Sequence, residues 1–248
     1  MKRKKGIIIA LFVLCVVVCI ALVCLKENRQ RENVFYGEKQ VDIYTLKYEY
    51  SCKGKEGSVI MQADVPKVSG EGYEKVAEAI EQYYSVDELQ DNLQTMYQEG
   101  QTTMETRVLE CTRMDDDVIS FKETVHYFEN GGFTIQEGTT FSVKNGEVLE
   151  LDELLSDKDA FYSVIDDLIV EELPVRYPEI EGQCEEYKEI YNDHYRTQGE
   201  LPEWYLEETG IAFSFEEMEF LSRNYGCMSV EVPYEKVRGG LKQEYVCE

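Results

Sequence analysis

Basic residues are scarce in this chain of 248 residues, which has 25 Lys and Arg against 50 Asp and Glu and a formal net charge of −25 at pH 7. Residues 1–31 hold seven of the bases and one of the acids, so residues 32–248 keep 18 bases against 49 acids, a net charge of −31. Such a charge repels nucleic acid and anionic membrane, and it attracts cations and basic proteins. We expect no nucleic-acid partner. The charge indicates either a basic partner or a well-solvated surface.

The usual catalytic and metal-binding motifs are also missing. The chain has no GxSxG elbow, no HExxH, no glycine-rich phosphate loop and no SxxK that pairs with a second motif. It has only two histidines, His126 and His194, and no cysteine pair at CxxC spacing, so a zinc or redox site is not expected. Paired carboxylates of a hydrolase are defined by geometry rather than by spacing, so they stay an open alternative. The sequence predicts no catalytic residue, no metal site and no cofactor.

Only one long apolar run is present, Gly6–Leu25, whose 20 residues carry no charge. As a helix it would reach about 30 Å, the thickness of the hydrocarbon core of a bilayer. The denser positive flank, residues 2–5, precedes the run. This arrangement predicts a cytoplasmic tail over residues 1–5, a transmembrane helix over residues 6–25 and an external chain from Lys26 onward. Residues 26–40 are polar and aperiodic and are predicted to form a tether. We expect a single-pass protein of the cell membrane with its N-terminus inside and its C-terminal domain outside.

A removable or lipidated leader fits this segment less well. A cleaved signal peptide has a shorter apolar core of about 7–15 residues and a small-residue exit, whereas this run ends in Leu-Val-Cys-Leu. A lipidated cysteine would follow a small residue, and the three cysteines of the run follow leucine or valine. Five further cysteines lie outside, and this odd number allows at most two disulfides without indicating their connectivity: Cys52, Cys111, Cys184, Cys227 and Cys247.

In the external part, segments typical of strands alternate with segments whose apolar residues have the spacing of helices. This order predicts an α+β fold with antiparallel sheets and packed helices. Apolar residues alternate with polar ones over residues 41–52, and residues typical of strands recur in the other segments predicted to be strands: residues 58–65, 106–112, 118–128, 210–215 and 228–232. Apolar residues recur three or four apart in the segments predicted to be helices: residues 73–84, 85–97, 159–173 and 185–195. The turns Asn130-Gly131-Gly132 and Asn145-Gly146 predict a meander of four strands in the centre. We divide the external part into a small N-terminal α+β lobe, residues 41–102, and a C-terminal α+β domain, residues 103–248.

With the turns in place, the chain resembles the extracytoplasmic domain of the RsiV anti-sigma proteins. The resemblance is carried by the hairpin segments Tyr127–Gly132 and Phe141–Leu155, by Trp204-Tyr205-Leu206 leading to Gly210–Phe215, by Tyr225-Gly226, by Val230–Tyr234 and by Leu241. Upstream, Val65–Gly70 is similar to the smaller domain that precedes it in RsiV and in the deacetylase PdaC. The likeness covers about Val41 to Leu241 and implies the fold of that domain pair.

The chain departs from that family in two places. The family often has Gly-Gly-Ala-His-Gly where this chain has residues 131–135, Gly-Gly-Phe-Thr-Ile, and it has Pro-Tyr-Glu where this chain has residues 216–218, Glu-Glu-Met. Any ligand contact made by these stretches would therefore differ. The resemblance implies a non-catalytic binding or sensing module of the bacterial envelope, with lysozyme or peptidoglycan as its ligand class.

Two other functions stay open on the sequence: an envelope carbohydrate hydrolase or modifying enzyme that uses paired carboxylates, and a structural membrane-tethered subunit of an envelope complex. The ligand-binding candidates are four aromatic residues, because exposed aromatic side chains make good anchors in interfaces. The same residues would otherwise belong to the core. They are Trp204, Tyr205, Tyr225 and Tyr234.

Overall fold

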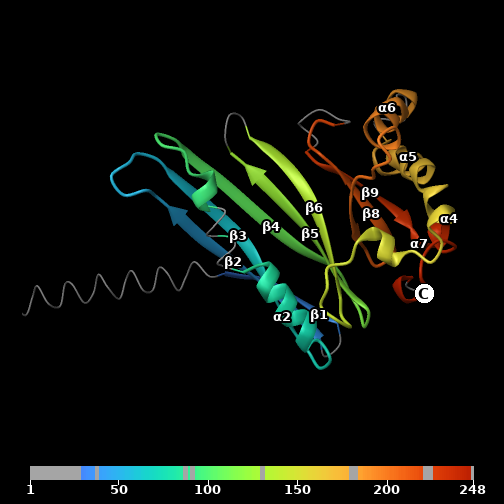
Figure 1. The fold of residues 1–248 in the computed structure, drawn as a ribbon, viewed down its shortest axis with the longest axis horizontal. Helices are drawn as coiled ribbons and strands as arrows, with labels where there is room; N and C mark the ends of the chain where they lie inside the picture. The colour runs from blue at the N-terminus through green and yellow to red at the C-terminus, as the bar shows by residue number, and fades with distance from the viewer. Residues whose placement is uncertain are drawn as a thin grey trace, which may run out of the picture.

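The structure is a computed structural model that describes residues 29–36, 39–85, 89, 93–128, 132–178, 184–219 and 226–246. The predicted tail, residues 1–5, and the predicted span, residues 6–25, lie outside the described residues. Among the described helices, none is both long enough and apolar enough to cross a bilayer. The fold is α+β, as predicted, with one large and one small sheet (Figure 1).

The large sheet has six strands that lie in chain order, and neighbouring strands are antiparallel except for β3 and β4, which are parallel. The parallel pair is possible because α2 (Glu74–Tyr83) and the residues after it carry the chain back before β4 begins. The strands are β1 (Arg29–Tyr36), β2 (Lys39–Tyr50), β3 (Ser58–Ser69), β4 (Thr102–Met114), β5 (Val118–Tyr127) and β6 (Phe133–Ser142).

Two strand pairings in this region cross the predicted boundaries. The tether predicted over residues 26–40 contains β1, whose backbone pairs with β2 from Arg29 opposite Thr45 to Tyr36 opposite Lys39. An edge strand is held by main-chain hydrogen bonds, which require no apolar period in its sequence. The predicted boundary at residues 102 and 103 lies within the sheet, where β3 and β4 pair from Ser58 opposite Thr102. The two predicted lobes share one sheet.

The small sheet is antiparallel and contains β7 (Glu203–Leu206), β8 (Gly210–Phe215) and β9 (Met228–Pro233). Helices gather around it on the right of Figure 1. They are the short 3-10 turn η1 (Leu151–Leu154), α4 (Lys158–Tyr162), α5 (Ile165–Arg176), α6 (Cys184–Tyr191), the π-helical turn η3 (Asn192–Arg196), α7 (Tyr234–Val237) and η5 (Gln243–Tyr245).

Two expected elements differ in detail. The Asn145-Gly146 turn reverses the chain, but the fourth strand of the predicted meander is reduced to a single bridge between Phe141 and Val148, because the chain then turns into η1. The helix predicted over residues 159–173 is split into α4 and α5, and α5 continues past Pro174 to Arg176. Asp157 caps α4 by accepting a hydrogen bond from the N–H of Ala160.

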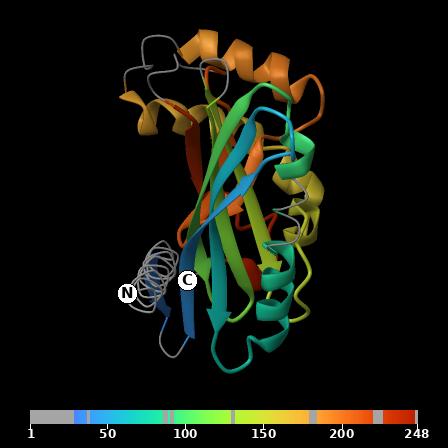
Figure 2. The ribbon, with the colours of Figure 1, turned by 90° about the vertical axis from the view of Figure 1, so that its left-hand side faces the viewer.

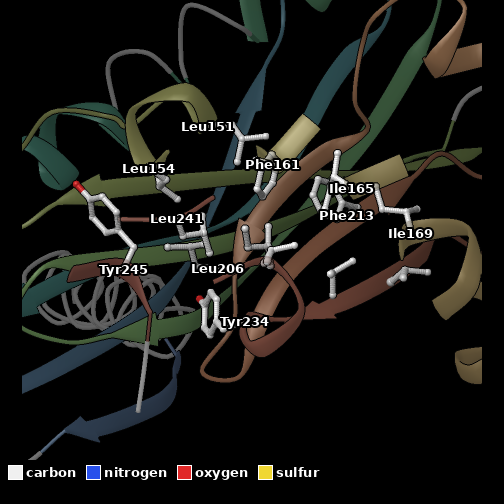
Figure 3. Packing of buried hydrophobic residues seen from close by; sticks show 14 of the residues in the cluster. Leu151, Leu154, Phe161, Ile165, Ile169, Leu206, Phe213, Tyr234, Leu241 and Tyr245 are labelled. Carbon is white, nitrogen blue, oxygen red and sulfur yellow. The ribbon is translucent and has the colours of Figure 1, made fainter. Parts of the chain in front are cut away.

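Separate apolar clusters lie on the two sides of the structure. One face of the large sheet packs against α2 through Phe121, Phe141, Val76 and Ile80, and Figure 2 shows this helix alongside the sheet. The second cluster lies between the small sheet and its helices and includes Phe161, Ile165, Ile169 and Phe213 (Figure 3). Side chains alternate along a strand, so the residues of β5 and β6 that face away from α2 are free to meet the small sheet.

Candidate functional site

Strand β7 crosses the face of the large sheet that points away from α2, and a glycine permits the crossing. A Cβ atom at Gly138 of β6 would lie only 1.8 Å from the carbonyl oxygen of Trp204 in β7. The outer edge of β7 is hydrogen-bonded by side chains of the large sheet: the N–H of Leu206 donates to Ser120 Oγ at 2.9 Å, and Thr112 Oγ1 donates to the carbonyl oxygen of Leu206 at 2.6 Å. These contacts satisfy buried backbone groups that a free strand edge would leave unpaired.

The crossing of the two sheets leaves two hollows, of about 410 Å³ and about 250 Å³, which share Leu201, Pro202 and Glu203. We call the two together the Glu203 groove. The larger hollow is also lined by Tyr162 and by the half-buried Trp204. The smaller one runs along β6 and is lined by Ile135, Gln136, Glu137, Tyr195, Ser214 and Glu216.

The Glu203 groove is acidic. Four acidic residues line it, and no Lys, Arg or His is among its lining residues in the described part of the chain: Glu137, Glu150, Glu203 and Glu216. Burial raises the pKa of Glu203 and the charge of Glu137 raises it further, while a hydrogen bond from the backbone N–H of Gly138 acts in the opposite direction. A cationic ligand group would relieve this repulsion, so the groove suits the side chains of lysine and arginine.

More carboxylates follow behind the groove. Glu137 of β6 lies opposite Glu123 of β5 in register, and Arg107 of β4 forms ion pairs with Glu123 at 3.5 Å and with Glu105, which is fully buried. Burial raises the pKa of Glu123 to about 7; the charge of Arg107 opposes this shift, and Glu137 and Glu105 add to it. The positive charge of Arg107 is therefore paired with Glu105 and Glu123 in the sheet. The acids that line the Glu203 groove have no cation among the described residues that line it.

Large exposed apolar residues occur at the end of the β5–β6 hairpin. Phe128 is 57 % exposed and Phe133 is 50 % exposed, and the ring of Phe133 stacks on that of Tyr127 with centroids 4.5 Å apart. The N–H of Phe128 donates to the carbonyl oxygen of Met104, whose side chain is also exposed. The ring of Phe128 lies near His126 and that of Phe133 near Tyr127, so the two phenylalanines extend the exposed apolar surface on both faces of the hairpin end.

The segment before β9 meets the same hairpin. The thiol of Cys227 contacts the carbonyl oxygen of Thr134 at 3.1 Å and is hydrogen-bonded to the backbone of Glu217. Met218, next to Glu217, is 60 % exposed and has a φ of 73°, in the left-handed region that non-glycine residues rarely adopt. We call Phe128, Phe133 and Met218 the apolar tip. It adjoins the Glu203 groove, because Ile135 and Glu216 line the groove two residues from Phe133 and Met218.

No protein-family model matches this chain, and no curated protein matches it either. Solved structures that are similar to it include two proteins of one family. A DUF3298 family protein from Pseudomonas aeruginosa PAO1 has 13 % identity and a TM-score of 0.56, and the match covers 83 % of this chain and 96 % of that one. A member of the same family from Bacteroides fragilis NCTC 9343 has 12 % identity and a TM-score of 0.59, with 86 % and 96 % covered. This chain has the DUF3298 fold. At such identities the likeness establishes the fold alone.

Within the DUF3298 fold, only one of the four predicted anchors lies in the groove. Trp204 lines it. Tyr205 and Tyr234 are 1 % and 3 % exposed and belong to the core, so they are not exposed anchors (Figure 3 shows Tyr234). The hydroxyl of Tyr234 accepts from Arg113 Nη1 at 2.6 Å and donates to the carbonyl oxygen of Glu207 at 2.9 Å, which explains how a polar ring is buried there. Tyr225 lies outside the described residues.

The sequence reasoning missed the apolar tip and the acids of the groove. One signal was available for the tip, because aromatic residues stand on both sides of the Asn130-Gly131-Gly132 turn, where a solvent-exposed hairpin end is normally polar. Thr134 and Glu217 belong to the two stretches where the chain departs from the RsiV pattern, and both are hydrogen-bonded to Cys227 at this end of the DUF3298 fold. The acids of the groove could not be singled out from the sequence, because 49 carboxylates are spread over residues 32–248.

The described residues hold no group of three or more His, Cys, Asp or Glu arranged to bind a metal ion. Three of the described cysteines, Cys52, Cys111 and Cys227, are free thiols. Burial raises the pKa of Cys111 to about 12, so this thiol stays protonated and unreactive at neutral pH. Cys247 and the side chain of Cys184 lie outside the described residues.

Proposed function

We propose that this chain is a membrane-anchored extracytoplasmic binding module of the bacterial envelope that captures a basic protein of the lysozyme class, without catalysis. One observation carries the proposal: the exposed apolar tip adjoins a groove whose four carboxylates have no compensating base among the lining residues that the structure describes. Apolar rings supply contact area that is removed from water, and the carboxylates supply charge for lysine and arginine side chains. The resemblance to the RsiV domain supports lysozyme as the class of ligand.

The same charges favour a basic protein over peptidoglycan. The stem peptides of peptidoglycan carry carboxylates of their own, and these would be repelled by Glu137, Glu203 and Glu216. The net charge of −31 over residues 32–248 would in addition steer a basic protein toward the domain from a distance.

The test is the binding of lysozyme to the full chain in nanodiscs of zwitterionic lipid, with empty nanodiscs as the reference. We expect saturable binding with a Kd in the micromolar range or tighter. Between about 50 mM and about 300 mM NaCl the association rate should fall about tenfold or more, while the dissociation rate changes little, because salt screens long-range attraction more than it weakens close contacts.

Cytochrome c, which is basic but has a different shape, is the control protein. Equal binding of lysozyme and cytochrome c would mean that the net negative charge of the chain attracts any basic protein, and specific capture of lysozyme would be refuted. Binding of peptidoglycan fragments in place of lysozyme would also refute the proposal and assign the groove to a glycan.

A second function is favoured by a single feature of the groove. Glu137 and Glu203 line the same hollow, and the pKa of Glu203 is raised, as expected of a general acid beside a second carboxylate. Such an enzyme would release reducing ends from peptidoglycan, and Glu203→Gln would abolish the release. If the wild-type chain releases none above an empty-nanodisc blank, the hydrolase is ruled out.

A further inference from the structure

A second groove lies on the opposite side of the large sheet, between α2 and the β2–β3 hairpin. Its volume is about 440 Å³. We call it the α2 groove. Its floor is apolar and only half-buried, so the side chains that form it retain contact with water: Tyr44, Leu46, Val65 and Ala77.

One wall of the α2 groove is acidic. Glu74, Glu78 and Glu81 line it from α2 and are all exposed. Spacings of four and three residues place them on one side of the helix over about 10 Å. Glu74 accepts a hydrogen bond from the N–H of Gly72, and among the described residues neither Glu78 nor Glu81 forms an ion pair. Lys67 is the single base among the residues that line this groove.

The floor of the α2 groove lies close to the start of β1. Arg29 pairs with Thr45 and Gln30 with Tyr44, so β1 enters the sheet next to the floor residues Tyr44 and Leu46. Arg29 follows the end of the predicted span, Leu25, by four residues, which reach at most about 14 Å when fully extended. With the predicted anchor in place, the α2 groove therefore stands near the membrane surface.

We propose that the α2 groove binds a membrane-proximal peptide segment of a partner protein, in which apolar side chains are followed by lysine or arginine. The apolar side chains would cover the floor, and the bases would pair with Glu74, Glu78 and Glu81 on the wall. Anionic lipid fits poorly, because the acidic wall repels it. A second copy of this chain fits poorly for the same reason, since its external surface is acidic. This surface is distinct from the Glu203 groove, because α2 and β7 lie on opposite faces of the large sheet.

The test uses the full chain in nanodiscs of zwitterionic lipid and a fluorescent leucine–lysine peptide of roughly 12 residues, whose leucines recur at helical spacing. Glu74→Gln, Glu78→Gln and Glu81→Gln are combined in one variant. The matched control combines Glu185→Gln, Glu186→Gln and Glu189→Gln, which are exposed on α6 and change the net charge equally. We expect the wall variant to weaken peptide binding about tenfold or more and the α6 variant to weaken it less than about twofold.

The floor is tested separately with Leu46→Gln, after its thermal unfolding has been compared with that of the wild type. We expect weaker binding of the leucine–lysine peptide and no change for a lysine–serine peptide of equal charge. An equal loss in the wall and α6 variants would mean that only net charge acts, and the proposal would be wrong. A leucine–glutamate peptide that binds as tightly, or a chain dimer that Leu46→Gln dissociates, would equally overturn it. Because all of these variants leave the Glu203 groove unchanged, their lysozyme binding should match the wild type.

Discussion

The hydroxyl of Thr112 in β4 donates a 2.6 Å hydrogen bond to the carbonyl oxygen of Leu206 in β7, 94 residues later in the chain. The N–H of the same leucine donates to Ser120 Oγ. Two hydroxyl groups of one sheet thus satisfy both backbone groups of a residue at the edge of the other sheet. The position of β7 across the large sheet, and with it the shape of the Glu203 groove, depends on these bonds.

Replacement of Thr112 by valine keeps the size of the side chain and removes its hydroxyl. The carbonyl oxygen of Leu206 then loses its partner in a buried position, and we expect a loss of about 1–3 kcal/mol in the free energy of unfolding. Urea unfolding of the variant measures this loss. Thr102→Val, at an exposed position, is the control and should change stability by less than about 0.5 kcal/mol. Equal effects of the two substitutions would contradict the importance of the bond.

Alanine at position 138 would force β7 away from β6, because its Cβ would overlap the carbonyl oxygen of Trp204. We expect Gly138→Ala to destabilise the chain by about 3 kcal/mol and to weaken lysozyme binding. Gly239→Ala is the control, since a Cβ there meets no atom within 4 Å. Urea unfolding and lysozyme binding are measured together. A Gly138→Ala chain as stable as the Gly239→Ala chain would show that β7 moves freely.

Loss of the aromatic rings at the apolar tip should weaken lysozyme binding without loss of stability. For the double variant Phe128→Ser and Phe133→Ser we expect a Kd that is about 30-fold higher, mainly through faster dissociation, because rings that are removed from water in the complex hold it together. Val175→Ser is the matched control, since Val175 is 72 % exposed on α5 and lies away from the tip. Surface plasmon resonance separates the two rates. An unchanged dissociation rate would assign the contact to another surface.

Removal of carboxylates from the Glu203 groove should slow the association of lysozyme rather than speed its dissociation. The double variant Glu137→Gln and Glu203→Gln removes two of the four carboxylates, and we expect a several-fold slower association at low salt that disappears at high salt. The control pair Glu185→Gln and Glu189→Gln removes the same charge from α6. If the α6 pair slows association equally, the groove has no special part in the encounter.

Stability should depend on pH through Glu123, whose pKa is raised from 4.5 to about 7. The folded chain then holds a proton that the unfolded chain releases above pH 4.5, so this group lowers stability as the pH rises from about 4.5 to 7. Glu123→Gln removes the effect. We expect the variant to be about 2 kcal/mol more stable than the wild type at pH 8 and nearly equal to it at pH 5.

Glu207, whose pKa is also raised to about 7, remains in both proteins, so the comparison isolates Glu123. The exposed Glu189→Gln is the control and should behave like the wild type at both pH values. Urea unfolding at the two values measures the difference. A constant difference between the Glu123→Gln variant and the wild type would rule out a raised pKa.

The periodic segments of the sequence predicted most elements of the fold. The strands predicted at residues 118–128 and 210–215 and the helix predicted from Tyr73 to Tyr84 were confirmed as β5, β8 and α2. The helical spacing follows from the burial of one face of α2 through Val76 and Ile80, whereas every residue of β8 is buried. The prediction failed at β1 and at the junction of β3 with β4. Main-chain hydrogen bonds pair β1 with β2 and β3 with β4, and the pattern of side chains in the sequence does not indicate which strands pair.

The candidate site was less predictable than the fold. Tyr205 and Trp204 are neighbours with the same sequence signal, yet one is buried and the other lines a groove, because successive residues of a strand face opposite sides. Local sequence therefore identified aromatic residues without showing which of them meet solvent.

The sequence by itself determined the acidic surface, the single apolar run, the absence of the common catalytic motifs and the α+β class, since these depend on composition and on local period. Only the tertiary structure decided that the segments of Phe133 and Met218 lie at the same end of the fold, that Glu137 and Glu203 line one groove and that α2 holds a second groove on the opposite face. Residues that are far apart in the chain come together through the crossing of two sheets. That crossing rests on Thr112, Ser120 and Gly138, whose contacts no local pattern encodes.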